Sequence, residues 1–274
     1  GDENAPKDME SVEIWKKVGI PENRIYFLPK EDNWWSPGDN GPCGPCSEMF
    51  YDMVGNVGDL TPAGFLEATK NEDVIEIWND VFMEYEKKDG KVIGKLTQKN
   101  VDTGAGLERM TAVMQGKKTA YDTDLLEDVV QKLSSHISTI GADTLIFTRI
   151  IVDHLRTALF LVADGVLPSN KDRGYVLRRL LRRAGVRAQH LCVTHSVLME
   201  LLDIYIQKYK DTYPEIYNTR NRDTINSELY KYNSTIIDGL KEFEKGIDPF
   251  ILATTYGFPI ELTLELAKEK GRTI

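Results

Sequence analysis

Cysteine is scarce in this sequence, and a long apolar segment is absent. The 274 residues include three cysteines, Cys43, Cys46 and Cys192, which are too few and too unevenly spaced for a disulfide framework. No stretch approaches the ~20 consecutive apolar residues of a membrane-spanning helix. The first residues, Gly1 to Asn4, are acidic, whereas a signal peptide begins with basic residues. We therefore expect a cytoplasmic protein without a membrane partner.

Excess positive charge is also lacking. Lysine and arginine total 34 against 43 aspartates and glutamates, and the net charge is −9. This balance excludes a protein that coats nucleic acid along its whole surface. The basic residues are unevenly placed, however, because one short stretch without an acid contains Arg173, Arg178, Arg179, Arg182, Arg183 and Arg187.

These arginines should repel one another unless an anion or a partner neutralises them, since a solvated helix face usually interleaves acids. The stretch therefore predicts a surface that binds an anion. An internal alternative stays open, in which some of these arginines pair with aspartates or glutamates elsewhere in the helical part of the chain.

The distribution of glycine and proline along the chain predicts two structural parts. Glycine and proline are dense up to about Gly116, and residues 75–86 alternate as a strand that is covered on both faces. A turn at Asp89-Gly90 predicts a hairpin with a second strand over residues 91–96. Residues 34–48 are too polar and too broken for a core element, so we expect a loop whose backbone closely approaches another group.

After Tyr121 the apolar residues recur at the spacing of an α-helix. The spacing predicts helices over residues 145–163, 175–189, 197–209, 224–245 and 259–270. We therefore expect an α+β fold, with a boundary near residue 117 between an α+β part and an all-helical part.

Two short motifs could carry chemistry. Cys43-x-x-Cys46 resembles half a zinc site, but the second half is missing, so two small residues in a tight loop are the better interpretation. The segment from Asp102 to Arg109 places an acid before glycines and an arginine after them. Asp102 could hold an ammonium group and Arg109 a phosphate. A strand-to-helix turn with an N-capping acid would look the same.

In four blocks the sequence resembles the alanyl-tRNA synthetases, a family of class II aminoacyl-tRNA synthetases. The blocks are residues 32–52 with the run Gly41-Pro42-Cys43-Gly44-Pro45-Cys46-Ser47-Glu48, residues 76–83, residues 101–109 and residues 163–179. A fifth block, Thr255-Tyr256-Gly257-Phe258-Pro259, lies near the end. The resemblance covers essentially the whole chain.

The resemblance implies that residues 1–117 are the C-terminal half of a class II aminoacylation domain with an antiparallel sheet. Residues 118–274 would be the helical tRNA-recognition domain. The family activates alanine with ATP, with Mg²⁺ expected, and transfers it to the acceptor stem of the alanine tRNA. Catalysis in this class rests on positioning and charge stabilisation. No zinc is expected here.

The resemblance also assigns alanine and ATP contacts. Asp102 matches the acid that binds the alanine ammonium, with Gly104 beside it. The positions around the alanine side chain and carboxylate are matched by Trp35, Asn79 and Val81. Arg109 matches the arginine of the third class II motif, which binds the ATP phosphates together with Gly106 and stabilises charge as pyrophosphate leaves.

For the tRNA, Asn170 matches an asparagine that reads a G–U wobble pair. The expected tRNA contacts further include Arg173, Arg178, Arg179, Arg182 and Arg183. Thr254 is also an expected tRNA contact, although family members commonly have an aspartate at this position, two residues before Tyr256, and threonine is uncharged.

The first two class II motifs would precede Gly1. We therefore expect the chain alone to form alanyl-adenylate poorly and to need a separate N-terminal catalytic half if the enzyme is split. The alternative is a non-catalytic module that binds the tRNA acceptor stem.

Overall fold

The computed structural model describes residues 6–137, 140–258 and 260–272. The acidic start at Gly1 to Asn4 and the predicted helix start at Pro259 lie outside the described residues. The chain divides into two compact units, residues 1–125 and residues 126–274. None of the described helices is long and apolar enough to cross a membrane.

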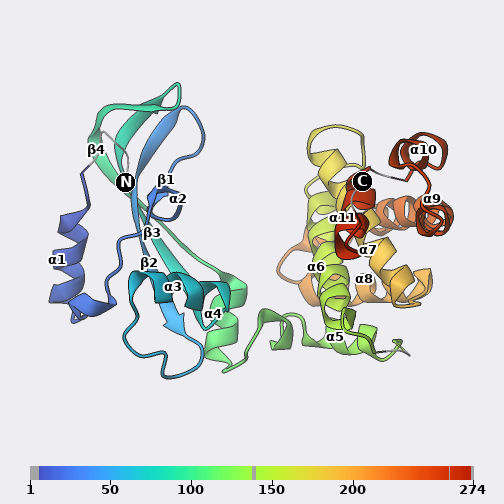
Figure 1. The fold of residues 1–274 in the computed structure, drawn as a ribbon, viewed down its shortest axis with the longest axis horizontal. Helices are drawn as coiled ribbons and strands as arrows, with labels where there is room; N and C mark the ends of the chain where they lie inside the picture. The colour runs from blue at the N-terminus through green and yellow to red at the C-terminus, as the bar shows by residue number, and fades with distance from the viewer. Residues whose placement is uncertain (1–5, 138–139, 259, 273–274) are drawn as a thin grey trace. The chain divides into compact units, whose positions relative to one another are not determined.

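The first unit is built on a four-stranded antiparallel sheet in the order β1-β2-β3-β4 (Figure 1). Its strands are β1 (Trp34–Trp35), β2 (Gly41–Asp52), β3 (Val74–Lys88) and β4 (Lys91–Ala105). The strands and the many helices together confirm the predicted α+β class. The assignment of residues 1–117 and 118–274 to two functional domains stays a prediction.

The predicted hairpin is confirmed and is longer than expected. Strands β3 and β4 pair from Lys88 and Lys91 at the turn to Trp78 and Ala105 at the far end. Asp89 and Gly90 both have positive φ, at 47° and 79°, which suits the tight turn that joins right-twisted antiparallel strands. The second strand continues past Leu96 because its partner β3 continues alongside it.

The prediction of a loop over residues 34–48 is wrong, because most of this run is strand. β2 begins at Gly41, and β1 pairs with it through Trp34 and Trp35. Pro45 is tolerated because the register shifts between Cys43 and Cys46, so this proline lies in a bulge where no ladder bond to β3 is needed.

The expected close backbone approach is present in this run, at Gly44. A Cβ built on Gly44 would lie 1.8 Å from the carbonyl oxygen of Phe82. Only glycine fits here, because the neighbouring atom belongs to the backbone of β3. Next to it, Cys43 is buried in a small core with Trp34, Tyr85 and Val92.

Short helices complete the first unit. Thr61 caps α3 with its hydroxyl, and Phe65 and Ala68 of that helix pack against Val74 of β3. Helix α4 follows β4 directly and also contacts β3. The helical segments are α1 (Met9–Lys17), η1 (Glu22–Arg24), α2 (Lys30–Asn33), α3 (Pro62–Lys70), α4 (Leu107–Met114) and η2 (Ala120–Asp122).

The second unit contains helices joined by loops and no strand among its described residues (Figure 1). Its elements are α5 (Glu127–Ser134), α6 (Thr144–Ala163), α7 (Asp172–His190), α8 (His195–Tyr209), η3 (Pro214–Ile216), α9 (Thr219–Glu244), α10 (Pro249–Thr255) and α11 (Ile260–Glu269). The helices predicted from the 3.6-residue period are confirmed, with boundaries that differ by a few residues. Helix α9 begins at Thr219, where the side chain of Asn218 caps its first turn.

The core of this unit surrounds α6 and α7. Leu155 and Leu159 of α6 and Leu177 and Leu181 of α7 are fully buried. The hydroxyl of Tyr205 in α8 donates to the carbonyl oxygen of Val152 at 2.9 Å, which satisfies a polar group inside this core.

Candidate functional site

Four of the predicted alanine-binding residues share one face of the sheet. In the register of β3 and β4, Asn79 lies opposite Gly104 and Val81 lies opposite Asp102. Directly opposite residues in an antiparallel pair point to the same face, and residues two apart along a strand do so as well. The register therefore brings together an amide, an apolar side chain, a carboxylate and a position without a side chain.

The neighbouring strand adds Glu48 to this face, a residue to which the sequence assigned no role. Glu48 lies opposite Asn79, and the Nδ2 atom of Asn79 donates to Glu48 Oε1 at 3.1 Å. The other polar atom of Asn79, Oδ1, is buried and has no hydrogen-bond partner among the described residues. A buried acceptor without a partner is costly, so this oxygen is suited to accept from a bound ligand.

Burial and negative neighbours change the acidity of this region. Burial, together with the charge of Glu76, raises the pKa of the Glu48 carboxyl to about 7. Burial and the charge of Glu48 raise the pKa of the Cys46 thiol to about 12, so Cys46 is a neutral thiol near pH 7. With a pKa of about 7, the Glu48 carboxyl changes charge near neutral pH.

The raised pKa of Glu48 predicts a loss of stability as the pH rises. Its unfolded-state pKa is near 4.5, so between about pH 4.5 and 7 the native state binds more protons than the unfolded state. The free energy of unfolding should fall through that window. We expect an NMR titration of the Glu48 carboxyl carbon to show a midpoint near 7, and Glu48→Gln to flatten the fall in stability.

Glu67→Gln, at an exposed position in α3, is the control for this substitution. A Glu48 midpoint near 4.5, or equal pH profiles for the two variants, would contradict the prediction.

Asp102 lies within β4 and does not cap the following helix. The N-cap of α4 is Gly106, so the alternative interpretation of Asp102 as an N-capping acid is wrong. Asp102 Oδ1 accepts from the backbone N–H of Thr103 at 2.9 Å. Its carboxylate is exposed and has no ion pair among the described residues, which leaves its charge available.

Arg109 projects from the first turn of α4 and pairs with Glu76 of β3. Its Nη1 atom lies 2.9 Å from Glu76 Oε2 and 3.2 Å from the carbonyl oxygen of Glu76. The side chain is 54% exposed, so the other donors of the guanidinium group are open to solvent. Trp35 lies apart in the edge strand β1, opposite Gly44, and among the described residues no hydrogen bond or ring contact joins it to Asn79 or Asp102.

The described residues contain no group of three or more histidine, cysteine, aspartate or glutamate side chains arranged to hold a metal ion. Cys43 is buried, Cys46 is half-buried and Cys192 is exposed in the other unit.

The arginine stretch forms α7, and several of its side chains have internal partners. Arg178 Nε lies 2.9 Å from Glu228 Oε1, and Arg183 Nε lies 2.8 Å from Glu265 Oε1. The guanidinium of Arg187 is fully buried and contacts Glu265 and Glu269 at 2.7 and 2.6 Å. The internal alternative therefore holds for these three arginines, which face acids from α9 and α11, far along the chain. An anion-binding surface stays a prediction for the rest of the stretch.

Three predicted tRNA contacts keep exposed polar groups. Arg173 and Arg179 are exposed and have no acid partner among the described residues. Asn170 is exposed in the loop before α7, and its Oδ1 accepts from Arg178 Nη1. Arg182 is half-buried, with its guanidinium 4.2 Å from the ring centroid of Tyr232.

Thr254 lies on α10, and its hydroxyl donates to the carbonyl oxygen of Phe250 at 2.7 Å. No hydrogen bond joins it to the described loop around Asn170. Its predicted contact with tRNA stays a prediction.

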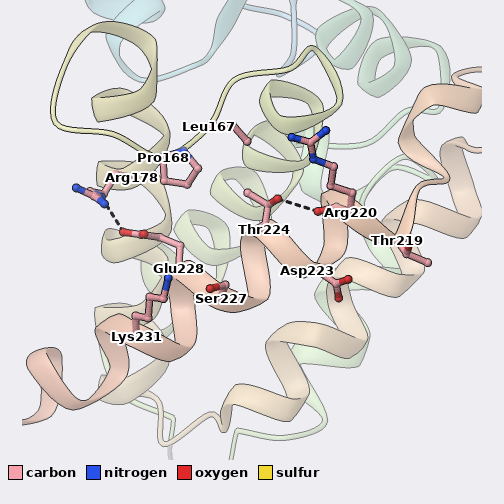
Figure 2. A pocket seen from close by; sticks show the side chains of 10 residues that line it. All are labelled: Leu167, Pro168, Arg178, Thr219, Arg220, Asp223, Thr224, Ser227, Glu228 and Lys231. Atoms are coloured by element: carbon pink, nitrogen blue, oxygen red, sulfur yellow. Dashed lines mark hydrogen bonds and ion pairs between the residues drawn. The ribbon is translucent and has the colours of Figure 1, made fainter.

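A pocket of about 580 Å³ lies beside the Asn170 loop. Figure 2 shows Arg178 and Glu228 at one end of it and Thr219 at the other. One face of α9 forms most of the wall, and Leu167 and Pro168 from the loop before α7 close it. This pocket was not predicted, because its walls come from segments about fifty residues apart.

The family model for class II (A) tRNA synthetases matches residues 2–274. A protein named alanine–tRNA ligase from Magnetococcus marinus is 38% identical over 96% of this chain. Proteins of the same name from Corynebacterium efficiens and Rickettsia felis are 40% and 39% identical over 96% and 97% of it. The chain spans 32% of the length of each of these relatives. The match over nearly every residue shows that the chain belongs to the class II (A) tRNA synthetases.

Proposed function

We propose that the chain supplies part of the alanine and ATP site, and the tRNA acceptor-stem site, of an alanine–tRNA ligase. The observation that carries this proposal is the strand register, which gathers Asn79, Val81, Asp102 and Gly104 on one face. The relatives named alanine–tRNA ligase support the choice of amino acid.

Each residue on this face suits one part of alanine. The exposed carboxylate of Asp102 is a counter-charge for the ammonium group, and Asn79 Oδ1 is a further acceptor. Val81, only 8% exposed, offers an apolar surface to the methyl group. A Cβ on Gly104 would meet no atom within 4 Å, so the space above this position is open to a ligand.

The ATP phosphates would lie near the start of α4. Arg109 uses one of its nitrogen atoms on Glu76, which leaves further donors for phosphate oxygens. Gly106 lets the backbone approach the nucleotide because it has no side chain. Mg²⁺ binds to one or two carboxylates plus substrate phosphates. Glu48 and Glu76 would supply such carboxylates, because they are close enough for the charge of Glu76 to raise the pKa of Glu48.

The mechanism that these residues support is positioning. Asp102 and Asn79 would hold the amino group so that the alanine carboxylate faces the α-phosphate of ATP, which it attacks. Arg109 would stabilise the negative charge that grows on the departing pyrophosphate. Mg²⁺, when bound, would add positive charge to the phosphates. No side chain of this chain acts as a nucleophile in this proposal.

The test is the binding of alanine to Asp102→Asn. We expect alanine affinity to fall about 10- to 100-fold, because a charged hydrogen bond contributes about 1.5–3 kcal/mol, while ATP affinity changes little. Equilibrium dialysis of each labelled ligand against the purified chain measures both affinities.

Asp80→Asn is the matched control, because Asp80 neighbours Val81 on β3 and points to the opposite face. Equal losses of alanine and ATP binding in Asp102→Asn would show that Asp102 has a structural role only.

The residues proposed to contact tRNA fall into two groups, those with an acid partner in the structure and those without one among the described residues. Arg173 and Arg179 are available to backbone phosphates because they are exposed and unpaired among the described residues. The contributions of Arg182 and Arg183 would be smaller, because Glu228 and Glu265 lie 3.6 and 2.8 Å from them. Asn170 would contact a base edge, which is the type of contact that gives sequence preference.

A further inference from the structure

The orientation of the Asn170 amide is fixed by the chemistry of its neighbour. A guanidinium group only donates hydrogen bonds, so the atom of Asn170 that faces Arg178 Nη1 must be the oxygen, Oδ1. The amide nitrogen, Nδ2, then points away from Arg178. It has no partner among the described residues and is exposed. Asn170 therefore presents a donor to any ligand at this surface.

Arg178 is in turn held by a buried acid. Its Nε atom donates to Glu228 Oε1 at 2.9 Å, and Glu228 is only 8% exposed. Glu228 also lies 3.6 Å from Arg182, whose guanidinium packs on Tyr232. Two nitrogen atoms of the Arg178 guanidinium are thus occupied, Nε by Glu228 and Nη1 by Asn170. Figure 2 shows the first of these contacts at the end of the pocket.

The backbone of the loop is fixed as well. A Cβ on Gly174 would lie 2.3 Å from Ser169 Oγ and 2.4 Å from the carbonyl oxygen of Leu167, so this loop packs directly on the first turn of α7. The backbone N–H of Ser169 donates to the carbonyl oxygen of Gly174 at 3.2 Å. With the backbone fixed, the rotation of the Asn170 side chain is the remaining freedom, and Arg178 removes it.

We propose that Glu228 and Arg178 are positioning residues, which hold the Asn170 amide as a donor toward one base pair of an RNA duplex. This inference rests on the proposed function. A fixed donor distinguishes base pairs, because a G–U pair and a G–C pair present minor-groove acceptors at different positions. An amide that rotates freely would offer its oxygen or its nitrogen to either pair and would lose that preference.

The experiment compares two acceptor-stem hairpins that differ in a single pair, G–U or G–C, in binding to the 274-residue chain. We expect the wild-type chain to prefer one of them. Glu228→Gln and Arg178→Lys should each reduce the ratio of the two affinities by roughly fivefold or more. The ratio that remains should be close to the ratio measured for Asn170→Ala. The affinity for the less preferred hairpin should change less than twofold.

Arg178→Lys separates positioning from direct contact with phosphate. Lysine keeps the charge, but its single ammonium cannot reach Glu228 and Asn170 in the way that the guanidinium fork does. A positioning role therefore predicts a lost preference with an unchanged salt dependence. If Arg178→Lys keeps the preference of the wild type, Arg178 does not position Asn170 and the inference is overturned.

Glu265→Gln is the control for general destabilisation. It removes an acid that faces Arg183 and Arg187 of the same helix. Because Glu265 has no hydrogen bond or ion pair with the described loop around Asn170, the affinity ratio should be that of the wild type. Circular dichroism checks that each variant is folded. A wild-type chain that binds both hairpins equally would overturn the proposed base reading together with this inference. A preference that persists in Glu228→Gln would overturn the inference alone.

Discussion

Replacing Arg187 with methionine is expected to destabilise the helical unit by about 3–5 kcal/mol, since removing one partner of a buried ion pair leaves the other without its counter-charge. Arg187 is completely buried and contacts both Glu265 and Glu269. Its guanidinium also lies 4.6 Å from the ring centroid of Phe147. The loss should fall toward the lower end of that range, because Arg183 still pairs with Glu265.

The two units can be followed separately in this experiment. All four tryptophans, Trp15, Trp34, Trp35 and Trp78, belong to the first unit, so tryptophan fluorescence reports on that unit. The long helices belong to the second unit, so helical circular dichroism in urea reports mainly on the second. Arg179→Met on the same helix is the control, because Arg179 is exposed and unpaired among the described residues. Its effect should be within about 0.5 kcal/mol. Equal unfolding midpoints for the two variants would contradict a stabilising role for the buried guanidinium.

Gly44→Ala should disrupt the sheet of the first unit. The added methyl group would lie 1.8 Å from the carbonyl oxygen of Phe82, and no rotamer change can relieve a clash with backbone. Overpacking of this kind costs about 1–3 kcal/mol and sometimes more, and we expect the upper part of that range. Urea unfolding followed by tryptophan fluorescence measures the loss.

Gly94→Ala is the matched control for this substitution. Gly94 lies in β4 of the same sheet, and a Cβ there would meet no atom within 4 Å. Its effect should be small. A Gly44→Ala variant as stable as Gly94→Ala would show that β2 can move away from β3 at the bulge.

The elements that the sequence predicted best are those with a strong local pattern. Alternating residues and the Asp89-Gly90 turn were sufficient for the β3–β4 hairpin, and the apolar stripe of α7 for that helix. The prediction of a loop over residues 34–48 was wrong because glycine and proline usually interrupt strands. Here the bulge at Gly44 and Pro45 accommodates both residues within β2. Glycine is required at position 44 because of the close approach to Phe82, which is a tertiary contact without a local sequence signal.

The sequence proposed the residues of the candidate site one by one, and their roles stay predictions, whereas it gave no signal for the side chains that contact them. Asp102 and Arg109 stand out by their charges beside glycines, whereas the link of Asn79 to Glu48 depends on the register between β2 and β3. The acid partners of α7 carry no local signal, because Glu228 is 50 residues from Arg178. Long-range ion pairs of this kind are set by the packing of whole helices.

The distance along the chain between α7 and its acids also bears on the order of folding. Arg187 and Glu269 are 82 residues apart, so a chain that emerges from the ribosome N-terminus first exposes the α7 arginines long before α11 exists. Closing such distant contacts is intrinsically slow. During that interval Arg187 lacks the two carboxylates that it contacts in the folded unit, and it gains them only when α11 is in place.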